Sequence, residues 1–262
     1  MDTENKDDGD DLGLSHEKFG RMTAEQKIAW DNKISAEIKS ALMGQGGNEY
    51  WTIRCSCLEA IKQWKREFST KDNEAALFSV TMMFCTKKMV KEIDDDGNEI
   101  KIKRNDGTRR SLFYSENIQM VTDGFNEWYK RMLQFHMNNY RQSANVEKQV
   151  KGWCFIEHHR SNMKKNRITT AIGGASPFHS HSVLVVHGDY VEKFRSNIDR
   201  FKDAHDKMDY TQTGNLLIEE VDVIEAWVTY CAKVYKKMSK SLFYHKDKMN
   251  FAFGGNVQSK QK

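Results

Sequence analysis

The first quarter of the chain carries its hydrophobic side chains at helical spacing. Thr23 and Gln26 form the pattern of a capping box at the start of a helix. The apolar stripe that follows consists of Ile28, Ile34, Ile38 and Leu42, and a second stripe consists of Leu58, Ile61, Trp64 and Phe68. These two stripes predict a helical annex over residues 14–70. Residues 1–13 are acidic and poor in large apolar groups, which predicts disorder.

Beyond residue 75 the apolar pattern changes to that of strands. Apolar runs predict strands at residues 75–86, 151–159, 178–188 and 215–223, and Asp96-Gly97 is a turn signal between two short extended arms. Helical stripes are interleaved at residues 121–141, 190–208 and 224–240. The strands at 151–159 and 178–188 are expected to pair antiparallel. We predict an α+β fold over residues 71–245, with a central antiparallel sheet of about five strands flanked by helices, and a basic tail at 246–262.

Composition narrows the class of protein. The 262 residues are 39% hydrophobic and 30% charged, with a mean hydropathy of −0.76. No apolar run approaches the roughly 18 residues that span a bilayer, and the acidic start lacks the order of a signal peptide. Five cysteines without a CxxC pair predict reduced thiols. We therefore expect a cytoplasmic protein with no membrane partner. No GxxxxGK[ST] phosphate loop is present, which excludes an ATP-driven helicase module within this sequence.

The net charge of +4 conceals an asymmetry along the sequence. Residues 1–12 hold six acids against one lysine, whereas residues 232–262 hold eight lysines against one aspartate. The basic end predicts a surface that meets phosphate, although a lysine-rich face that only keeps the protein soluble has the same composition.

Two histidines are the first candidate for chemistry. His179 and His181 are two apart in a predicted strand, so both imidazoles leave the same face about 7 Å apart. Antiparallel pairing can bring the carboxylate of Glu157 to them, and His158 or His159 could replace Glu157 as third ligand. Nitrogen and oxygen ligands together suit a divalent ion such as Mn²⁺ or Mg²⁺. A histidine pair at the edge of a core, with no ion, is the alternative.

The last predicted helix carries a candidate nucleophile. At 100° per residue, Lys233 lies about 60° from Tyr230 and Lys237 about 20° from it, whereas Tyr235 is about 140° away on the apolar side. Neighbouring ammonium groups favour the phenolate and attract the phosphate that it would attack. The alternative is that Tyr230 is an amphipathic residue at the core margin.

The order of these motifs resembles that of the HUH endonucleases, in particular the rolling-circle replication initiators (Rep proteins) of small plasmids, phages and single-stranded DNA viruses. The resemblance covers about residues 75–240 and depends on FSVTMMF, on HSH at 179–181 and on YCAK at 230–233. It implies an HUH/RRM-like sheet. It also implies that His179 and His181, with Glu157, hold Mn²⁺ or Mg²⁺, that Tyr230 attacks the scissile phosphate, and that Lys233 assists it.

The resemblance further implies nicking and joining of single-stranded origin DNA through a 5′-phosphotyrosine. Contacts to the DNA backbone are expected from Lys164, Lys165, Arg167, Lys236, Lys237 and Lys240. A host helicase and polymerase are the implied partners, in the cytoplasm of the host cell, and the oligomeric state is left open. The alternatives are a non-catalytic nucleic-acid-binding module and an HUH relaxase or transposase.

Overall fold

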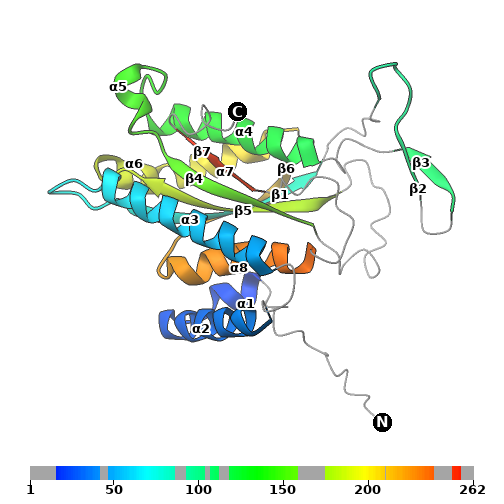
Figure 1. The fold of residues 1–262 in the computed structure, drawn as a ribbon. Coiled ribbons are helices and arrows are strands. Elements are labelled where there is room, and N and C mark those ends of the chain that lie inside the picture. The colour runs from blue at the N-terminus through cyan, green and yellow to red at the C-terminus, as the bar shows by residue number, and fades with distance from the viewer. Residues whose placement is uncertain are drawn as a thin grey trace, which may run out of the picture. The chain divides into compact units, whose positions relative to one another are not determined.

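The computed structural model describes the chain in eight stretches, residues 16–41, 47–85, 93–103, 107–111, 118–158, 175–209, 211–238 and 250–254. The chain divides into two compact units. Figure 1 labels the helices and strands of both. The helical unit comprises Met1–Leu58 and Asp222–Leu242, and the sheet unit comprises Glu59–Val221 and Phe243–Lys262.

The helical unit is built from α1 (His16–Gly20), α2 (Ala24–Ala41), the first half of α3 (Gly47–Phe68) and α8 (Ile224–Met238). The predicted capping box is confirmed. The N–H of Thr23 donates to Gln26 Oε1 at 2.8 Å, and the N–H of Gln26 donates to Thr23 Oγ1 at 3.3 Å. Two donors that a helix start leaves without intrahelical acceptors are thus satisfied by side chains.

A buried polar cluster joins three helices of this unit. Arg54 of α3 donates from Nη2 to both carboxylate oxygens of Asp31 in α2 at 3.1 Å, and from Nε to Thr229 Oγ1 in α8 at 2.7 Å. The hydroxyl of Thr229 also donates to Asp31. All three side chains are buried. We call them the arginine cluster.

The arginine cluster explains why the compact units do not follow the predicted domains. The sequence assigned a continuous annex to residues 14–70 and placed residues 224–240 with the sheet. Instead, α8 is grouped with α1, α2 and the start of α3. Thr229 gives α8 a buried polar contact with Asp31 and Arg54, and a pairing over such a sequence separation is not visible in local periodicity.

The sheet unit confirms the α+β prediction. Its five-stranded antiparallel sheet has the order β6-β1-β5-β4-β7. The strands are β1 (Ala76–Cys85), β4 (Lys151–His158), β5 (Ala175–Val186), β6 (Thr211–Glu220) and β7 (Asn250–Phe253). The antiparallel pairing of the strands at 151–159 and 178–188 is confirmed as β4 with β5.

Strand β7 corrects the prediction of a basic tail over residues 246–262. Ala252 and Phe253 are buried, and the ring of Phe253 packs on Phe125 and Tyr129 with centroid distances of 4.9 and 5.1 Å. The short apolar run NFAF, which is surrounded by lysines in the sequence, therefore completes the sheet at its β4 edge.

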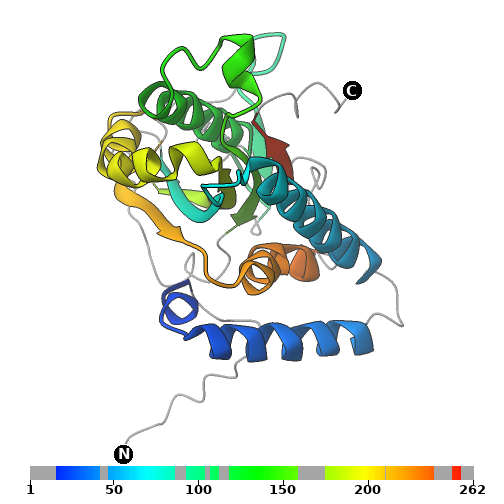
Figure 2. The ribbon, with the colours of Figure 1, turned by 90° about the vertical axis from the view of Figure 1, so that its left-hand side faces the viewer.

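Helices cover one face of this sheet. They are α4 (Ile118–His136), α6 (Val191–Ser196) and α7 (Ile198–Asp206), and α4 and α7 lie side by side (Figure 2). Phe78 of β1 points to them, with its ring centroid 4.6 Å from that of Phe194. The indole of Trp128 in α4 donates to the carbonyl of Phe201 in α7 at 3.2 Å. Because side chains alternate along a strand, Thr81 and His181 face the opposite side.

Among the shorter elements, one predicted turn is confirmed and one predicted helix is interrupted. The predicted turn at Asp96-Gly97 is confirmed, since Gly97 has φ 82° and its N–H donates to the carbonyl of Asp94 at 3.0 Å. A separate ribbon pairs β2 (Lys101–Lys103) with β3 (Arg109–Ser111), and α5 (Ser143–Val146) precedes β4. The single helix predicted over 190–208 is interrupted at Asn197 between α6 and α7, after the 3₁₀ turn η2 (Gly188–Tyr190).

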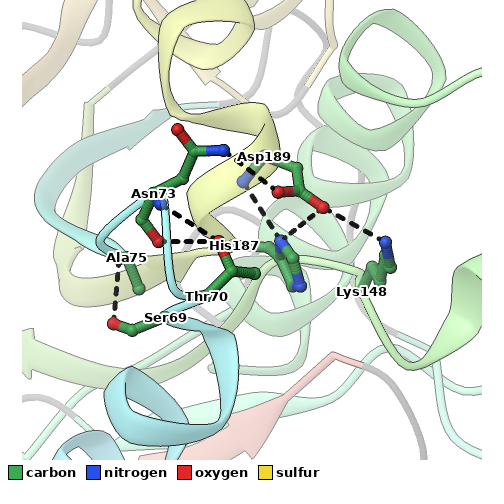
Figure 3. Close-up of polar contacts among 7 residues, drawn as sticks. All are labelled: Ser69, Thr70, Asn73, Ala75, Lys148, His187 and Asp189. Atoms are coloured by element: carbon green, nitrogen blue, oxygen red, sulfur yellow. Dashed lines mark hydrogen bonds and ion pairs between the residues drawn. The ribbon is translucent and has the colours of Figure 1, made fainter.

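A set of polar contacts fastens the loop after α3 to η2 (Figure 3). The amide of Asn73 donates to Asp189 Oδ1 at 3.3 Å, and Lys148 forms an ion pair with Asp189 Oδ2 at 3.2 Å. The backbones approach so closely that a Cβ on Gly188 would lie 2.2 Å from the carbonyl oxygen of Asn73. His187 accepts the N–H of Asp189 at 3.2 Å, and burial lowers the pKa of this histidine. The contacts hold the end of β5 in place.

The described residues also bear on membrane-spanning helices and on the state of the cysteines. None of their helices combines the length and the apolar character needed to cross a membrane. Cys55, Cys57, Cys154 and Cys231 are all free thiols, as the scattered spacing predicted.

Candidate metal centre

Neighbouring strands β4 and β5 place a carboxylate and two imidazoles on one face of the sheet. Glu157 is paired with His179, and Phe155 with His181. His179 and His181 share a face because they are two residues apart, and the antiparallel register brings Glu157 level with the first of them. The sequence predicted this arrangement from the strand period and the expected hairpin.

The three side chains are close enough to contact a single ion. Glu157 Oε2 lies 3.3 Å from His179 Nε2 and 3.4 Å from His181 Nε2. The imidazole centroids are 4.7 Å apart with an interplanar angle of 88°. One ligand atom from each residue lies within 4.8 Å of the other two. We call Glu157, His179 and His181 the metal cluster.

Burial makes the metal cluster unlike a set of surface side chains. His179 is 5% exposed, His181 is 1% exposed, and the side chain of Glu157 is 15% exposed. A carboxylate in such a place loses much of its hydration, and this loss is costly unless a cation or hydrogen bonds compensate it. Neutral imidazole nitrogens and a carboxylate oxygen are common donors to divalent transition metals. The cluster could therefore hold one divalent ion.

A threonine of β1 orients one of the two imidazoles. Thr81 is paired with His181, and its Oγ1 lies 3.0 Å from His181 Nδ1. With Nδ1 engaged in this way, Nε2 faces Glu157 and is the nitrogen available to an ion. The sequence analysis did not identify Thr81. Thr81 belongs to the motif FSVTMMF. Once the register of β1 against β5 is known, its pairing with His181 identifies it as a contact of that imidazole.

The structure describes neither the side chains of the alternative third ligands nor those of the expected DNA contacts. His159, Lys164, Lys165, Arg167 and Lys240 lie outside the described residues. The side chains of His158, Lys233, Lys236 and Lys237 also lie outside them, although their backbones belong to β4 and α8. These assignments stay predictions.

The candidate nucleophile is buried among aromatic rings. Tyr230 belongs to α8 of the helical unit and is only 2% exposed. Its ring stacks on Trp227, with centroids 5.5 Å apart and an interplanar angle of 20°, and lies 4.9 Å from the ring of Phe19. The helical wheel predicted lysines beside Tyr230. Their side chains lie outside the described residues, so this stays a prediction. The wheel of α8 alone could not show the aromatic contact with Phe19 of α1.

Comparison with known proteins adds no relative. No protein-family model, curated protein or solved structure matches the chain.

Proposed function

We propose that this protein is a metal-dependent endonuclease that nicks and rejoins single-stranded DNA, as a rolling-circle replication initiator does. The observation that carries the proposal is the metal cluster, in which Glu157 is within 3.4 Å of both His179 and His181. In the resemblance to the HUH endonucleases, His179 and His181 are the HxH motif, and Glu157 is the carboxylate that helps them to hold the metal. The fold agrees, since the HxH strand is in the interior of an antiparallel sheet beside the strand of FSVTMMF.

The proposed residues have distinct roles in the reaction. His179, His181 and Glu157 would hold Mn²⁺ or Mg²⁺, and the bound ion would polarise a non-bridging phosphate oxygen and stabilise the charge that develops during displacement. The phenolate oxygen of Tyr230 forms a bond to phosphorus while the bond from phosphorus to the 3′ oxygen breaks. The 3′ oxygen takes up a proton and leaves as a hydroxyl. Because the phosphotyrosine keeps the phosphodiester energy, joining needs no ATP.

The burial of Tyr230 adds a requirement to this scheme. A phenol that is 2% exposed and stacked on Trp227 cannot meet a phosphate until its hydroxyl becomes accessible. Phe19, whose ring is 4.9 Å away, is the part of α1 that covers it. Displacement of Phe19 is therefore part of the proposed reaction. A helicase and a polymerase of the host would then act on the nicked origin.

The decisive experiment is the formation of a covalent adduct with DNA. Purified protein is incubated with a labelled single-stranded oligonucleotide library and Mn²⁺, and the products are separated on a denaturing gel. We expect Tyr230→Phe to abolish the adduct and Tyr235→Phe, a matched change in the same helix, to preserve it. An adduct that survives in Tyr230→Phe would show that Tyr230 is not the nucleophile.

The metal requirement is tested on the same gel. EDTA is expected to stop cleavage, and the double variant His179→Ala with His181→Ala is expected to lose both cleavage and Mn²⁺ binding measured by titration calorimetry. Glu219→Gln is a suitable control for Glu157→Gln, because Glu219 is an exposed carboxylate on the same sheet face in β6. Undiminished cleavage in the double variant would exclude the metal cluster as the active site.

One observation favours a second candidate function, a nucleic-acid-binding module without covalent chemistry. The tyrosine of YCAK, Tyr230, is enclosed by the rings of Phe19 and Trp227 in the helical unit. If the ring stays enclosed, the protein binds DNA but forms no adduct. Retained DNA affinity with no adduct under Mn²⁺ or Mg²⁺, in the wild type and in Phe19→Ala, would identify this function.

A further inference from the structure

A basic groove lies on the helix-covered side of the sheet unit. It is a cavity of about 690 Å³ between α4, α7 and the segment that follows α4. Five cations line this basic groove: Lys130, Arg131, Arg141, Arg200 and Lys207. The helices that form it cover the sheet face opposite the metal cluster, because Phe78 points to the helices while Thr81 points to His181.

The charges of the basic groove are poorly balanced. Two carboxylates, Glu127 and Asp203, line it together with the five cations. Glu127 is engaged by Arg131, with Nε to Oε1 at 2.9 Å. Among the residues that the structure describes, the other four cations form no ion pair with a carboxylate. Cations that converge on a concave surface without carboxylate partners create a positive potential that attracts an anionic ligand.

Two guanidinium groups of the groove are held against aromatic rings. Arg200 Cζ lies 4.7 Å from the ring centroid of Phe135, and Arg141 Cζ lies 5.4 Å from that of Tyr140. Arg141 also donates from Nε to the Tyr140 hydroxyl at 3.0 Å. These contacts fix the guanidinium planes before any ligand arrives, which reduces the entropic cost of binding.

We propose that the basic groove binds the phosphate backbone of a single-stranded nucleic acid. The guanidinium edges and the two lysines meet phosphates, while the faces of the arginine–aromatic pairs offer planes on which unpaired bases stack. An acidic peptide would satisfy the charges but has no base to stack. The cavity volume is within the roughly 300–1,000 Å³ of ligand sites. This site goes beyond the proposed nicking function, because it needs neither a metal nor Tyr230.

The test is the affinity for a labelled ten-nucleotide oligo(dT), measured by fluorescence anisotropy in EDTA. Arg141→Gln with Arg200→Gln is expected to weaken binding at least tenfold. It should also reduce the slope of log K against log[salt] by about 1.4, because each phosphate that a cation no longer neutralises lowers the slope by roughly 0.7. The control is Lys62→Gln with Lys71→Gln, which removes the same charge from exposed positions that do not line the groove. An equally large drop in affinity in the control and in the arginine variant would overturn the proposal.

Two further arms separate this site from the metal cluster and from other ligands. His179→Ala with His181→Ala should bind the oligonucleotide in EDTA as the wild type does, whether or not it cleaves DNA. If that variant loses affinity and the arginine variant does not, the groove is not the binding site. A poly-glutamate of equal charge should displace the oligonucleotide at least tenfold less effectively, and equal displacement would contradict recognition of a nucleic acid. Circular dichroism melts confirm that each variant is folded.

Discussion

The arginine cluster and the metal cluster are two buried polar groups built around a carboxylate. In the helical unit Asp31 is enclosed with Arg54 and Thr229, so the chain itself supplies the cation. In the sheet unit Glu157 meets His179 and His181, whose imidazoles have no permanent charge. In the first cluster the chain supplies the cation, whereas in the second the carboxylate is brought together with two imidazoles.

This difference assigns different purposes to the two clusters. A buried carboxylate is tolerated when a cation and hydrogen bonds replace its lost hydration. Arg54 does this for Asp31 by donating to both carboxylate oxygens at 3.1 Å, and the hydroxyl of Thr229 donates to the same carboxylate. Glu157 and its two histidines instead converge their ligand atoms to within 4.8 Å, as an ion requires. We therefore regard the first cluster as structural and the second as a binding site.

The largest expected effect comes from removing the cation that the chain supplies. Arg54→Ala leaves Asp31 buried and without that cation, and we expect the free energy of unfolding to fall by about 3–5 kcal/mol. Urea denaturation at pH 7 measures the change. Replacing the pair together, with Arg54→Met and Asp31→Leu, should restore most of the stability because no buried charge is left. A decrease below about 1 kcal/mol in Arg54→Ala would show that the cluster is not a structural ion pair.

The metal cluster was predictable from the sequence and the arginine cluster was not. The alternation that puts His179 and His181 on one face is local, and a hairpin between adjacent strands fixes the position of Glu157. Asp31 and Arg54, in contrast, are ordinary charged residues of amphipathic helices, and nothing in their spacing indicates that α8 covers them. Contacts between elements that are distant in sequence leave no periodic signal.

The same limit explains why the sequence showed neither the aromatic contact of Tyr230 with Phe19 nor the strand β7. The helical wheel of α8 gave the direction of Tyr230 within its own helix, but the ring that covers it, Phe19, comes from the start of the chain. The strand of β7 has only four residues, Asn250–Phe253, and the lysines around it made the segment look like a solvated tail. Its pairing with β4 depends on the sheet edge that is already formed.

A third buried polar side chain, His136, differs from both clusters because it avoids a charge by remaining neutral. His136 is fully buried at the end of α4 between Tyr190 and Phe194, and neither ring nitrogen has a hydrogen-bond partner among the described residues. Burial, together with the positive charge of Lys193, lowers the pKa of His136 to about 4. The folded state therefore resists protonation of this histidine, whereas the unfolded chain takes up a proton near pH 6.5.

Stability should consequently fall as the pH falls from about 6.5 towards 4. Over this range the unfolded state binds a proton that the folded state does not, and His136 alone would lower the free energy of unfolding by about 3 kcal/mol by pH 4. His136→Phe should remove this part of the pH dependence. Urea denaturation at pH 7 and pH 4.5 compares the variant with the wild type, so that the contribution of His187 cancels. Equal pH dependence in both proteins would contradict the assignment.

A somewhat smaller effect is expected from supplying a divalent cation to the metal cluster. At a free Mn²⁺ concentration about 100 times the dissociation constant, binding to the folded state should raise the free energy of unfolding by about 2.7 kcal/mol. His179→Ala with His181→Ala should show no such increase, and Arg54→Ala should show all of it because its defect is in the other cluster. If Mn²⁺ stabilises the double histidine variant as much as the wild type, the ion does not bind at the metal cluster.

The smallest expected effect concerns the threonine that orients His181. Thr81→Val keeps the shape of the side chain in β1 but removes the hydroxyl 3.0 Å from His181 Nδ1. The imidazole can then rotate or change tautomer, and we expect the affinity for Mn²⁺ to fall about 10–100-fold, as when other partners of metal-binding histidines are removed. Titration calorimetry measures this decrease.

Thr81→Ser is the matched control, since it keeps a hydroxyl at the same position and should retain affinity within a few-fold of the wild type. The Mn²⁺ affinity separates the two roles that Thr81 could have. If the contact only packs the sheet, Thr81→Val lowers stability without metal and leaves Mn²⁺ affinity unaltered. If it holds Nε2 towards Glu157, the affinity falls as well, beside a loss of stability of about 1–3 kcal/mol because the buried Nδ1 of His181 loses its contact with the hydroxyl. Only the second outcome agrees with a cluster that is built to receive its cation from solution.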